Sequence, residues 1–515
     1  MIEKVLKKIA AFIRTDKFFY AVLIFFIFQA TWITVSVIYP QPFDENTHLG
    51  LIKLYSQYWS PFLSEQPPNA DVLGAVARDP SYLYHYLISF PYRIFAHFAH
   101  SLPAQIIFLR FINVAIFAAS LVVFRKVLQK TKATPGIINC VFLFFVLIPV
   151  VSLLAGQINY DSLLMLTVAA TLLLTLNFVE AIDKKRRVNL ILGLGVISTV
   201  IISSLVKTEF LPIFVVVIAF IIFKLSRFWR LNKAAFIRSV RKEMASTRRG
   251  TVILSLILFI VAGGLFFQRY GVNFLRYGTP VPRCDQVLTI EQCSANGSWK
   301  RGYDAERTKQ SVGPNPIRYS VSWVVRMFIY SFYTRSGGNP GAYYVNVNPL
   351  PLIGATAIAI FSSGILIFLF YARAILRDDK TLLLLLIISV VYYAVLWAHL
   401  YQGYLQSGQK FGINGRYLFP VILPVLLAIG LAYQRLLSKR PLVKPAFLII
   451  VFLLFLQGGG ILTFIVGSNQ YWYWDNQYVR SLNATAQKVV KPLIVERIGV
   501  VETLKEKALN KWHGQ

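Results

Sequence analysis

Cysteine and acidic side chains are both scarce in this chain of 515 residues. It has 3 cysteines, and 22 Asp and Glu residues stand against 53 Lys and Arg residues. No Cys-x-x-Cys pair and no cluster of Cys and His is present, which argues against a zinc site. Cys140 lies inside an apolar run, where a thiol packs as a small hydrophobe. Cys284 and Cys293 share one polar loop and would form a disulfide if that loop faces an oxidising compartment.

Three further absences narrow the class of protein. No basic soluble domain is present, so the net charge of +31 does not indicate nucleic-acid binding. No Gly-rich phosphate loop is seen, and no nucleotide or other cofactor is expected. The apolar run 18–39 is too long for the core of a cleavable signal and lacks a small-residue cleavage site. It is expected to be an uncleaved signal anchor.

Long apolar runs dominate the sequence, in which 56% of the residues are hydrophobic and only 15% are charged. A run of about 20 apolar residues crosses the roughly 30 Å of hydrocarbon in a bilayer as a helix. The sequence therefore predicts an all-α polytopic membrane protein with about eleven transmembrane helices. The runs are 18–39, 104–124, 137–155, 162–180, 188–206, 210–223, 251–267, 350–371, 381–398, 417–433 and 446–467.

Basic residues set the predicted orientation. Lys4, Lys7 and Lys8 precede the first run and indicate a cytoplasmic N-terminus. Alternating sides from there places every dense basic loop inside, except the long loop 269–349 and the tail, since long loops follow this rule poorly. We predict a transmembrane domain over 1–467 and a polar tail outside. Within and after that domain lie a first outer loop at 40–103, an outer cap loop at 269–349 and the tail at 468–515.

The first outer loop contains two segments rich in aromatic residues and interrupted by polar groups. These segments, 46–59 and 82–99, are expected to be amphipathic helices lying at the membrane interface. Helices placed there would admit a lipid-linked substrate sideways from the bilayer.

Polar residues at the ends of the runs fall on the predicted outer side. Solvated helix ends alone do not explain why the acids favour one side, whereas a shared polar cavity at the outer leaflet does. The residues concerned are Asp44, Glu45 and His48 after the first run, Asp161, Lys207, Glu209, His399, Lys410 and Arg416.

Ordinary structural explanations remain open for several of these residues. Asp161 could cap the helix that follows it, and Lys207 could extend to lipid headgroups. His48 and His85 are more often structural histidines than catalysts. Arg416 is different, because a cation at a helix N-terminus opposes the macrodipole, whereas a bound phosphate would explain it.

Two carboxylates with Lys and Arg near the outer leaflet suit one chemistry well. A carboxylate takes the proton of an acceptor hydroxyl as that hydroxyl attacks the anomeric carbon of a sugar. The leaving group is a lipid-linked phosphate, whose growing negative charge the cations stabilise.

Four short motifs carry a resemblance to a known superfamily. They are residues 43–45 (FDE) after the first run, residues 79–85 (DPSYLYH) in the first outer loop, residues 159–161 (NYD) before the fourth run and residues 415–417 (GRY) at the tenth. On these residues the chain resembles the GT-C integral-membrane glycosyltransferases, in the protein O-mannosyltransferase and aminoarabinose transferase group and in related bacterial membrane proteins. The first motif is similar to the Asp-Glu motif that follows the first span there, and the second to a Pro-Pro-Leu-Tyr segment, with Ser81 in place of the second proline. The third resembles a second acidic motif, and the fourth a Gly-Arg-Tyr signature.

The resemblance implies a GT-C-like fold and an inverting glycosyltransferase that uses a polyprenyl-phosphate-linked sugar. The catalytic candidates are Asp44 as general base, with Glu45 and Asp161. The donor-phosphate candidates are Lys207, Arg416 and Tyr417, and the substrate-binding candidates are His48, Tyr82 and His85. The acceptor is a hydroxyl of a glycan, lipid or protein, in a bacterial cytoplasmic membrane with the site outside. Whether a divalent metal takes part is left open.

Two other classes of function fit part of the same pattern. A lipid-linked-glycan flippase, or a non-catalytic binder of polyprenyl phosphate, would need the outer cations but no general base. A flippase is also expected to carry polar groups through its spans, whereas Arg110 is the clearest charged residue within these. A glycan polymerase or ligase is a further alternative among enzymes.

Overall fold

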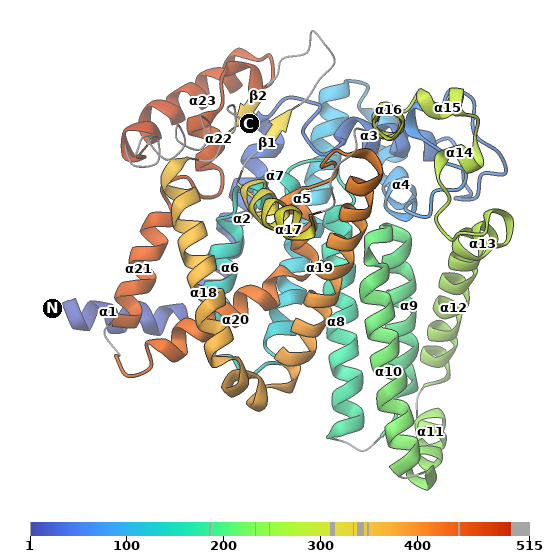
Figure 1. Cartoon of the computed structure of the whole chain (residues 1–515), viewed down its shortest axis with the longest axis horizontal. Helices are drawn as coiled ribbons and strands as arrows, with labels where there is room; N and C mark the ends of the chain where they lie inside the picture. The colour runs from blue at the N-terminus through green and yellow to red at the C-terminus, as the bar shows by residue number, and fades with distance from the viewer. Residues whose placement is uncertain are drawn as a thin grey trace.

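The computed structural model describes nine stretches of the chain, which fold into long upright helices with shorter helices and loops above them (Figure 1). The stretches are 2–184, 187–231, 233–246, 248–308, 315–332, 334–336, 345–347, 350–440 and 443–495. Much of the predicted tail, 496–515, and the Gly-rich part of the cap loop, 337–344, lie outside the described residues.

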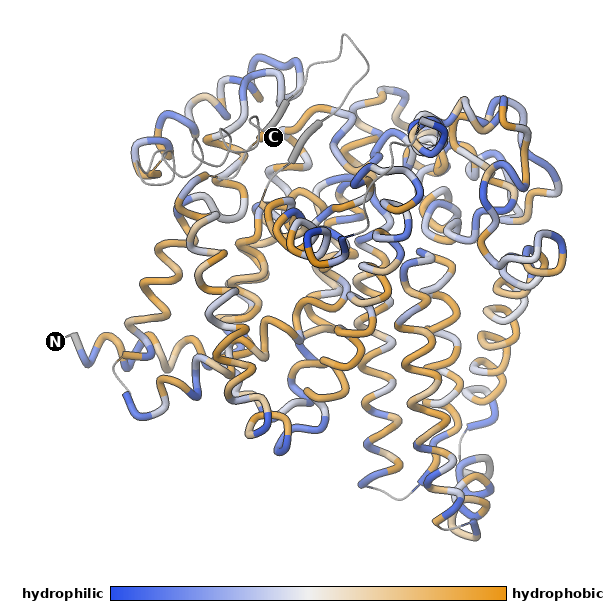
Figure 2. The backbone as a smooth tube through the Cα atoms, viewed as in Figure 1, coloured by the Kyte–Doolittle hydropathy of each residue, from blue (hydrophilic) through white to orange (hydrophobic). Residues whose placement is uncertain are grey.

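Within these stretches, eight helices are long and apolar enough to cross a membrane, or nine if one bent pair counts as a span. Their middle sections form an apolar belt, and hydrophilic segments lie above and below it (Figure 2). The eight are α2 (Asp16–Ser36), α5 (Leu102–Leu128), α8 (Asp161–Asp183), α10 (Leu211–Leu231) with the turn η2 (Thr208–Phe210), α12 (Arg249–Phe266) continuing through η3 (Phe267–Gly271) and α13 (Val272–Tyr277), α18 (Pro351–Asp378), α19 (Lys380–Ser407), and α20 (Ile422–Leu436) with the turn η4 (Gly415–Val421). The chain is an all-α polytopic membrane protein.

All eleven predicted runs fall on helices, but three of them differ from a full-length straight span, so the described residues contain eight or nine candidate spans and not eleven. The run 137–155 is broken into α6 (Pro135–Val146) and α7 (Pro149–Ala155), bent by 75°. Pro149 causes the break, since proline cannot donate its backbone nitrogen within a helix. The last run divides into α21 (Val443–Phe455) and α22 (Leu462–Gly467) at three glycines, 458–460. α9 (Leu190–Val206) is continuous, though only 17 residues long.

The two breaks satisfy one another's backbone groups. The Gln29 side chain donates to the Val146 carbonyl at 3.3 Å and accepts from the Ile461 backbone N–H at 3.0 Å. The Gly460 N–H donates to the Leu147 carbonyl at 2.7 Å. Broken helices are tolerated at membrane depth when other protein groups take the freed bonds. α7, which is buried along its whole length, can therefore lead directly into the candidate site.

Short elements cover the end of the bundle that the basic loops predict to face outward, which we call the outer end. The two predicted interfacial helices are present as α3 (Glu45–Tyr55) and α4 (Leu83–Phe98), and both lie there (Figure 1). The other elements of this layer are η1 (Asp71–Leu73), α14 (Cys284–Val287), α15 (Ile290–Ser294), α16 (Gly297–Arg307), α17 (Pro316–Ile329), the paired strands β1 (Thr334–Ser336) and β2 (Val345–Val347), η5 (Gln470–Trp472), α23 (Gln477–Val490) and η6 (Lys491–Leu493).

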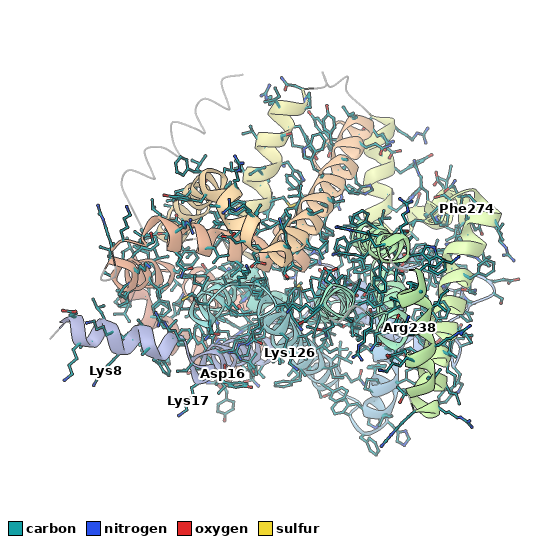
Figure 3. All side chains as sticks on the ribbon, turned by 90° about the horizontal axis from the view of Figure 1, so that it is seen from below. Lys8, Asp16, Lys17, Lys126, Arg238 and Phe274 are labelled. Carbon is teal, nitrogen blue, oxygen red and sulfur yellow. A yellow bond between two sulfur atoms is a disulfide. The ribbon has the colours of Figure 1, made fainter. Side chains whose placement is uncertain are left out.

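The opposite end, the inner end, carries α1 (Ile2–Ile13) and α11 (Lys233–Ser246). Figure 3 looks onto this end, and its labelled basic side chains, Lys8, Lys17, Lys126 and Arg238, come from four different helices. The positive-inside rule expects basic side chains to gather in this way on a cytoplasmic face.

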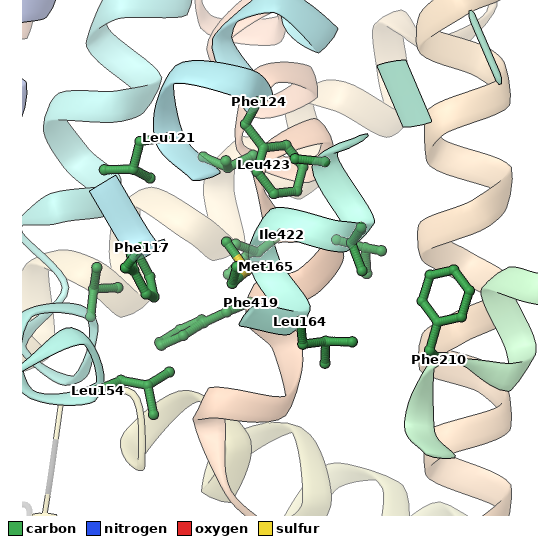
Figure 4. Packing of buried hydrophobic residues seen from close by; sticks show 14 of the residues in the cluster. Phe117, Leu121, Phe124, Leu154, Leu164, Met165, Phe210, Phe419, Ile422 and Leu423 are labelled. Carbon is green, nitrogen blue, oxygen red and sulfur yellow. The ribbon is translucent and has the colours of Figure 1, made fainter. Parts of the chain in front are cut away.

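Large apolar side chains fill the centre of the bundle (Figure 4). Phe117 of α5 and Met165 of α8 are almost completely buried, as is Phe419 of η4. Phe419 stacks edge-to-face on Phe145 at 5.7 Å. Because Phe419 lies three residues after Arg416, this packing fixes the start of the span that carries the candidate site.

Candidate functional site

Five charged side chains from four segments converge at the outer end, and we call them the ionic cluster. They are Asp44 before α3, Asp161 at the start of α8, Lys207 and Glu209 between α9 and α10, and Arg416 in η4. The structure thus brings together residues that are up to 372 positions apart in sequence, as the sequence analysis expected. Lys410, which was expected in the same group, instead donates to the Ser322 hydroxyl at 2.9 Å.

Lys207 lies at the centre of the ionic cluster and points inward. Its Nζ is 2.8 Å from Asp161 Oδ1 and 3.5 Å from Glu209 Oε1, and its side chain is only 2% exposed. The Nζ also lies between the rings of Tyr160 and Tyr417, 4.5 and 4.6 Å from their centroids. The alternative that Lys207 extends to lipid headgroups is therefore wrong. It is a buried cation held by two acids and two aromatic faces.

Arg416 is buried as deeply but is bound less closely. Its guanidinium nitrogens lie 3.6 Å from both Asp44 and Asp161, and its hydrogen bonds to the Phe43 carbonyl and the Tyr417 hydroxyl measure 3.4 and 3.5 Å. Among the described residues its Nε has no acceptor. A guanidinium has five N–H donors, and charge-assisted bonds are normally 2.7–2.9 Å long. Arg416 therefore keeps donors available although its own side chain is only 4% exposed.

The backbone at Arg416 is fixed by its neighbours. A Cβ on Gly415 would lie 2.6 Å from the Met327 carbonyl oxygen, so only glycine lets this turn approach α17 so closely. The Asn414 side chain accepts the Arg416 N–H at 3.1 Å. That amide is thus already occupied, and any anion at this place is bound by the guanidinium rather than by helix N-terminal amides.

Asp161 is the first residue of α8 but does not cap it. The residue at the N-cap position is Tyr160, and the Asn159 side chain accepts the Asp161 N–H at 2.8 Å. The capping interpretation of Asp161 is wrong for this reason. Its carboxylate instead holds Lys207, and its Oδ2 has no hydrogen-bond partner in the part of the chain that the structure describes.

Asp44 is the exposed acid of the group, with a side chain that is 61% accessible. Phe43 and Asp44 both have positive φ angles, 73° and 67°. Two successive non-glycine residues in this region cost about 1–3 kcal/mol each and persist only where the surroundings hold them. Here the Asn159 side chain and Arg416 both donate to the Phe43 carbonyl, at 3.1 and 3.4 Å.

Glu45 has a different environment from its neighbour Asp44. Its carboxylate is completely buried and receives two hydrogen bonds of 2.8 Å from Arg110. The backbone N–H groups of Gln41 and Ile158 also donate to it, at 2.6 and 3.0 Å. Each of the two carboxylate oxygens thus accepts two hydrogen bonds, and Glu45 has no lone pair free for a substrate. The structure favours a positioning role for Glu45, and it shows that the sequence analysis missed its partner Arg110.

His48 and His85 form a buried pair next to the ionic cluster. His48 Nδ1 is 2.8 Å from His85 Nε2, and the ring of Tyr160 packs edge-on against His48 at 4.6 Å. Burial lowers the pKa of His48 well below its usual range, and that of His85 to about 3. Both rings are therefore neutral and form part of the wall behind Lys207 and Tyr160.

Tyr82 is less well placed to contact a substrate. It is almost completely buried and lies under the Arg269 guanidinium, 4.6 Å from its ring centroid. Ser81, next to it, is closer to the ionic cluster. Its hydroxyl accepts the Thr208 N–H at 3.2 Å, directly beside Lys207. A proline at position 81, as in the motif that this segment resembles, could not make that bond.

Two further features bear on the expected chemistry of the outer end. Cys284 and Cys293 are joined by a disulfide between α14 and α15. Among the residues described, no group of three or more His, Cys, Asp or Glu side chains lies close enough together to hold a metal ion.

Comparison with known proteins identifies one family. The family described as a predicted membrane protein (DUF2142) matches residues 84–425. No curated protein and no solved structure matches the chain. The matched region holds Asp161, Lys207 and Arg416, and it begins after Asp44 and Glu45. Because this region covers well over half of the sequence, the chain belongs to the DUF2142 family of predicted membrane proteins.

Proposed function

We propose that this protein is a membrane glycosyltransferase of the GT-C type. It moves a sugar from a polyprenyl-phosphate-linked donor to an acceptor hydroxyl at the outer face of a bacterial cytoplasmic membrane, with inversion at the anomeric carbon. The motifs of the sequence and the ionic cluster at the outer end both support this proposal.

The observation that carries the proposal is the pairing of Arg416 with Asp44. Arg416 is a buried cation whose guanidinium hydrogen bonds and ion pairs are all 3.4 Å or longer, and Asp44 is an exposed carboxylate 3.6 Å away from it. A planar guanidinium with free donors matches two oxygens of a phosphate. An exposed carboxylate beside it is free to accept a proton. Arg416 could thus bind the phosphate of the donor while Asp44, next to it, takes the proton of the acceptor hydroxyl.

The reaction follows from these positions. The oxygen of the acceptor hydroxyl forms a bond to the anomeric carbon while its proton passes to the Asp44 carboxylate. The bond between that carbon and the phosphate oxygen breaks, and its electron pair leaves with the polyprenyl phosphate. Arg416 stabilises the charge that develops on the phosphate, and Lys207 adds a second positive charge within a site of low dielectric.

The other members of the site hold this geometry. Glu45 fixes the start of α3 through Arg110, which keeps Asp44 turned outward. Asp161 holds Lys207 at 2.8 Å and limits how far Arg416 can move. These are positioning residues, since each acts on the substrate through another side chain.

The surface of the first outer loop suits a lipid-linked donor. Trp59, Ile94 and Phe98 of this loop are 77%, 67% and 78% exposed. Arg93 stacks on the Trp59 ring at 4.0 Å. Exposed aromatic and aliphatic residues with an adjacent cation are typical of segments at the membrane interface. A polyprenyl chain could therefore stay in the bilayer while its phosphate reaches Arg416.

The test uses the purified full-length protein in lipid nanodiscs. We expect it to release polyprenyl phosphate from one member of a panel of polyprenyl-phosphate-linked hexoses and pentoses when acceptor glycans, lipids or peptides are supplied. Asp44→Asn should reduce release by about 100-fold or more, because a general base contributes 10²–10⁴-fold. The matched control is Asp475→Asn, another acid of the outer end, whose side chain is 86% exposed. That variant should keep full activity.

Two outcomes would count against the proposal. Release at the wild-type rate by Asp44→Asn would remove the general base from the mechanism. Tight binding of the donor without release, by the wild type and across the whole panel, would instead indicate a non-catalytic binder or a flippase. Flippase activity would then be measured as movement of the lipid-linked sugar between leaflets of a vesicle.

A further inference from the structure

A cavity of about 790 Å³ opens between helices at the inner end. Its walls come from α1, α6, α18, α20 and α21, which lie next to one another on one side of the bundle (Figure 1). Apolar side chains make up most of the lining, with Leu6, Ile137, Phe361, Leu426 and Leu448 as one example from each helix.

This cavity lies at the opposite end of the molecule from the ionic cluster. Arg416 is near one end of the span Gly415–Leu436, and the cavity-lining residues Gln434 and Leu437 are at its other end. A helix rises 1.5 Å per residue, so the 18 residues from Arg416 to Gln434 separate the two places by about 27 Å. The cavity is therefore a separate site at the level of the inner leaflet.

α1 closes this cavity from the side and has the form of an interfacial helix. It lies across the direction of the spans (Figure 1), with Lys8 labelled on it in Figure 3. Lys4 and Lys8 are exposed, whereas Leu6, Ala10 and Ile13 line the cavity. A helix with lysines on one face and apolar residues on the other lies in the plane of the membrane surface, with its apolar face toward the acyl chains.

Cations gather where the cavity meets the inner surface. Lys7, Arg14 and Lys444 all belong to its lining, and Glu3 is the acid among them. Glu3 pairs with Lys7 at 2.7 Å. Within the described stretches, no carboxylate lies within ion-pair distance of Arg14 or Lys444. The lining thus carries two positive charges that no acid of the described residues neutralises.

We infer that this cavity binds an anionic phospholipid of the inner leaflet, with its phosphate at Arg14 and Lys444 and its acyl chains against the apolar walls. Basic pockets between transmembrane helices on the cytoplasmic side bind acidic lipid headgroups. A volume of 790 Å³ is in the range of sites that enclose small ligands. The combination of hydrocarbon walls and a cationic rim selects an amphiphile with a negative head over a soluble anion.

The experiment compares two lipids that share the same acyl chains. The full-length protein, delipidated in a neutral detergent, is titrated with phosphatidylglycerol or phosphatidylcholine, and bound lipid is counted by native mass spectrometry. We expect phosphatidylglycerol to bind at least tenfold more tightly. The double variant Arg14→Gln/Lys444→Gln should lose about 30-fold of that affinity, since each cation near an anionic lipid surface contributes about 1 kcal/mol, or roughly fivefold.

The control variant removes two cations elsewhere at the inner end. Lys233→Gln/Arg238→Gln, on α11, should leave phosphatidylglycerol binding unchanged. A second variant, Ala10→Trp, keeps every charge but fills the cavity, and it should weaken binding of both lipids. Elution as a single species with an unchanged melting temperature shows that each variant is folded.

Three results would overturn the inference. Equal binding of the two lipids, or unchanged phosphatidylglycerol binding by Arg14→Gln/Lys444→Gln, would remove the headgroup site. Polyprenyl phosphate displacing phosphatidylglycerol at equimolar concentration would assign the cavity to the carrier lipid instead. Sugar release at the outer end is measured in parallel and should not change in the double variant, so this inference and the proposed function fail independently.

Discussion

The Glu45 carboxylate and the Arg110 guanidinium face one another through two hydrogen bonds of 2.8 Å, with both side chains completely buried. Arg110 also donates to the carbonyl oxygens of Thr34, Val37 and Ile38, at the end of α2. All five guanidinium N–H groups therefore have acceptors. A single residue of α5 ends the first span and fixes the start of α3.

Breaking this pair from one side should cost much of the stability of the outer end. Glu45→Gln leaves the Arg110 charge buried without its partner, and removal of one member of a buried pair typically costs 3–5 kcal/mol. We expect a clear fall in the melting temperature of the detergent-solubilised protein. The double variant Glu45→Gln/Arg110→Met should lose less than the two single losses added together. Additive losses would mean that the two side chains do not depend on one another.

The geometry of Arg416 should matter as much as its charge. Arg416→Lys keeps one positive charge but loses the planar pair of donors that fits two phosphate oxygens. We expect donor affinity to fall by about tenfold in Arg416→Lys and about 100-fold in Arg416→Gln, measured by titration with a polyprenyl-phosphate-linked sugar. Charge-assisted bonds of 1.5–3 kcal/mol correspond to losses of this size. Equal affinity in all three proteins would exclude Arg416 from the phosphate site.

Much of this architecture could be predicted from the sequence because membrane helices have a strong local signal. Length and hydropathy locate each of the eleven runs, and the basic loops orient them. The break at Pro149 was missed, since it depends on whether Gln29 and Gly460 are present in space to take the freed backbone bonds. Gln29 and Gly460 are each more than a hundred residues away in sequence from the break that they stabilise.

Most members of the candidate site were predictable, although Lys410 lies apart from it, but their roles within the site were not. Asp44, Asp161, Lys207 and Arg416 were expected to meet because the alternation of spans places them on one side. Pairing decides the roles, and no local pattern shows that Asp44 is exposed while its neighbour Glu45 is buried. One signal was available. A lone arginine inside a span requires a partner, and the adjacent acids of the outer end were the nearest candidates for it.

The disulfide between Cys284 and Cys293 gives a test of sidedness. Disulfides persist in oxidising compartments, so the cap loop should face outward. A membrane-impermeant maleimide applied to intact cells should label this loop only after mild reduction. Cys140, which lines the inner cavity, is the internal control and should not react. Labelling before reduction, or only after the cells are opened, would contradict the predicted orientation.

The His48 and His85 pair should make the protein less stable in acid. Both folded-state pKa values lie below the ordinary value of 6.5, that of His85 at about 3, because burial disfavours the charged rings. The stability that these two neutral rings contribute is therefore fully present above pH 6.5. It is lost as the pH falls toward 3, because the unfolded chain takes up protons at a higher pH than the folded protein does. At pH 5, 1.5 units below 6.5, the loss is about 2 kcal/mol for each histidine that stays neutral when folded.

The melting temperature, measured between pH 7.5 and pH 5, reports this loss. The wild type should melt several degrees lower at pH 5, and His48→Gln/His85→Gln should show a smaller shift from its own value at pH 7.5. His100→Gln, which removes an exposed histidine of the same outer loop, should shift as the wild type does. If the double variant and the wild type shifted equally, the acid sensitivity would belong to other groups. The loss expected in the wild type has a direct cause: the hydrogen bond of 2.8 Å between His48 Nδ1 and His85 Nε2 needs one nitrogen without a proton, so protonation of both rings would break it.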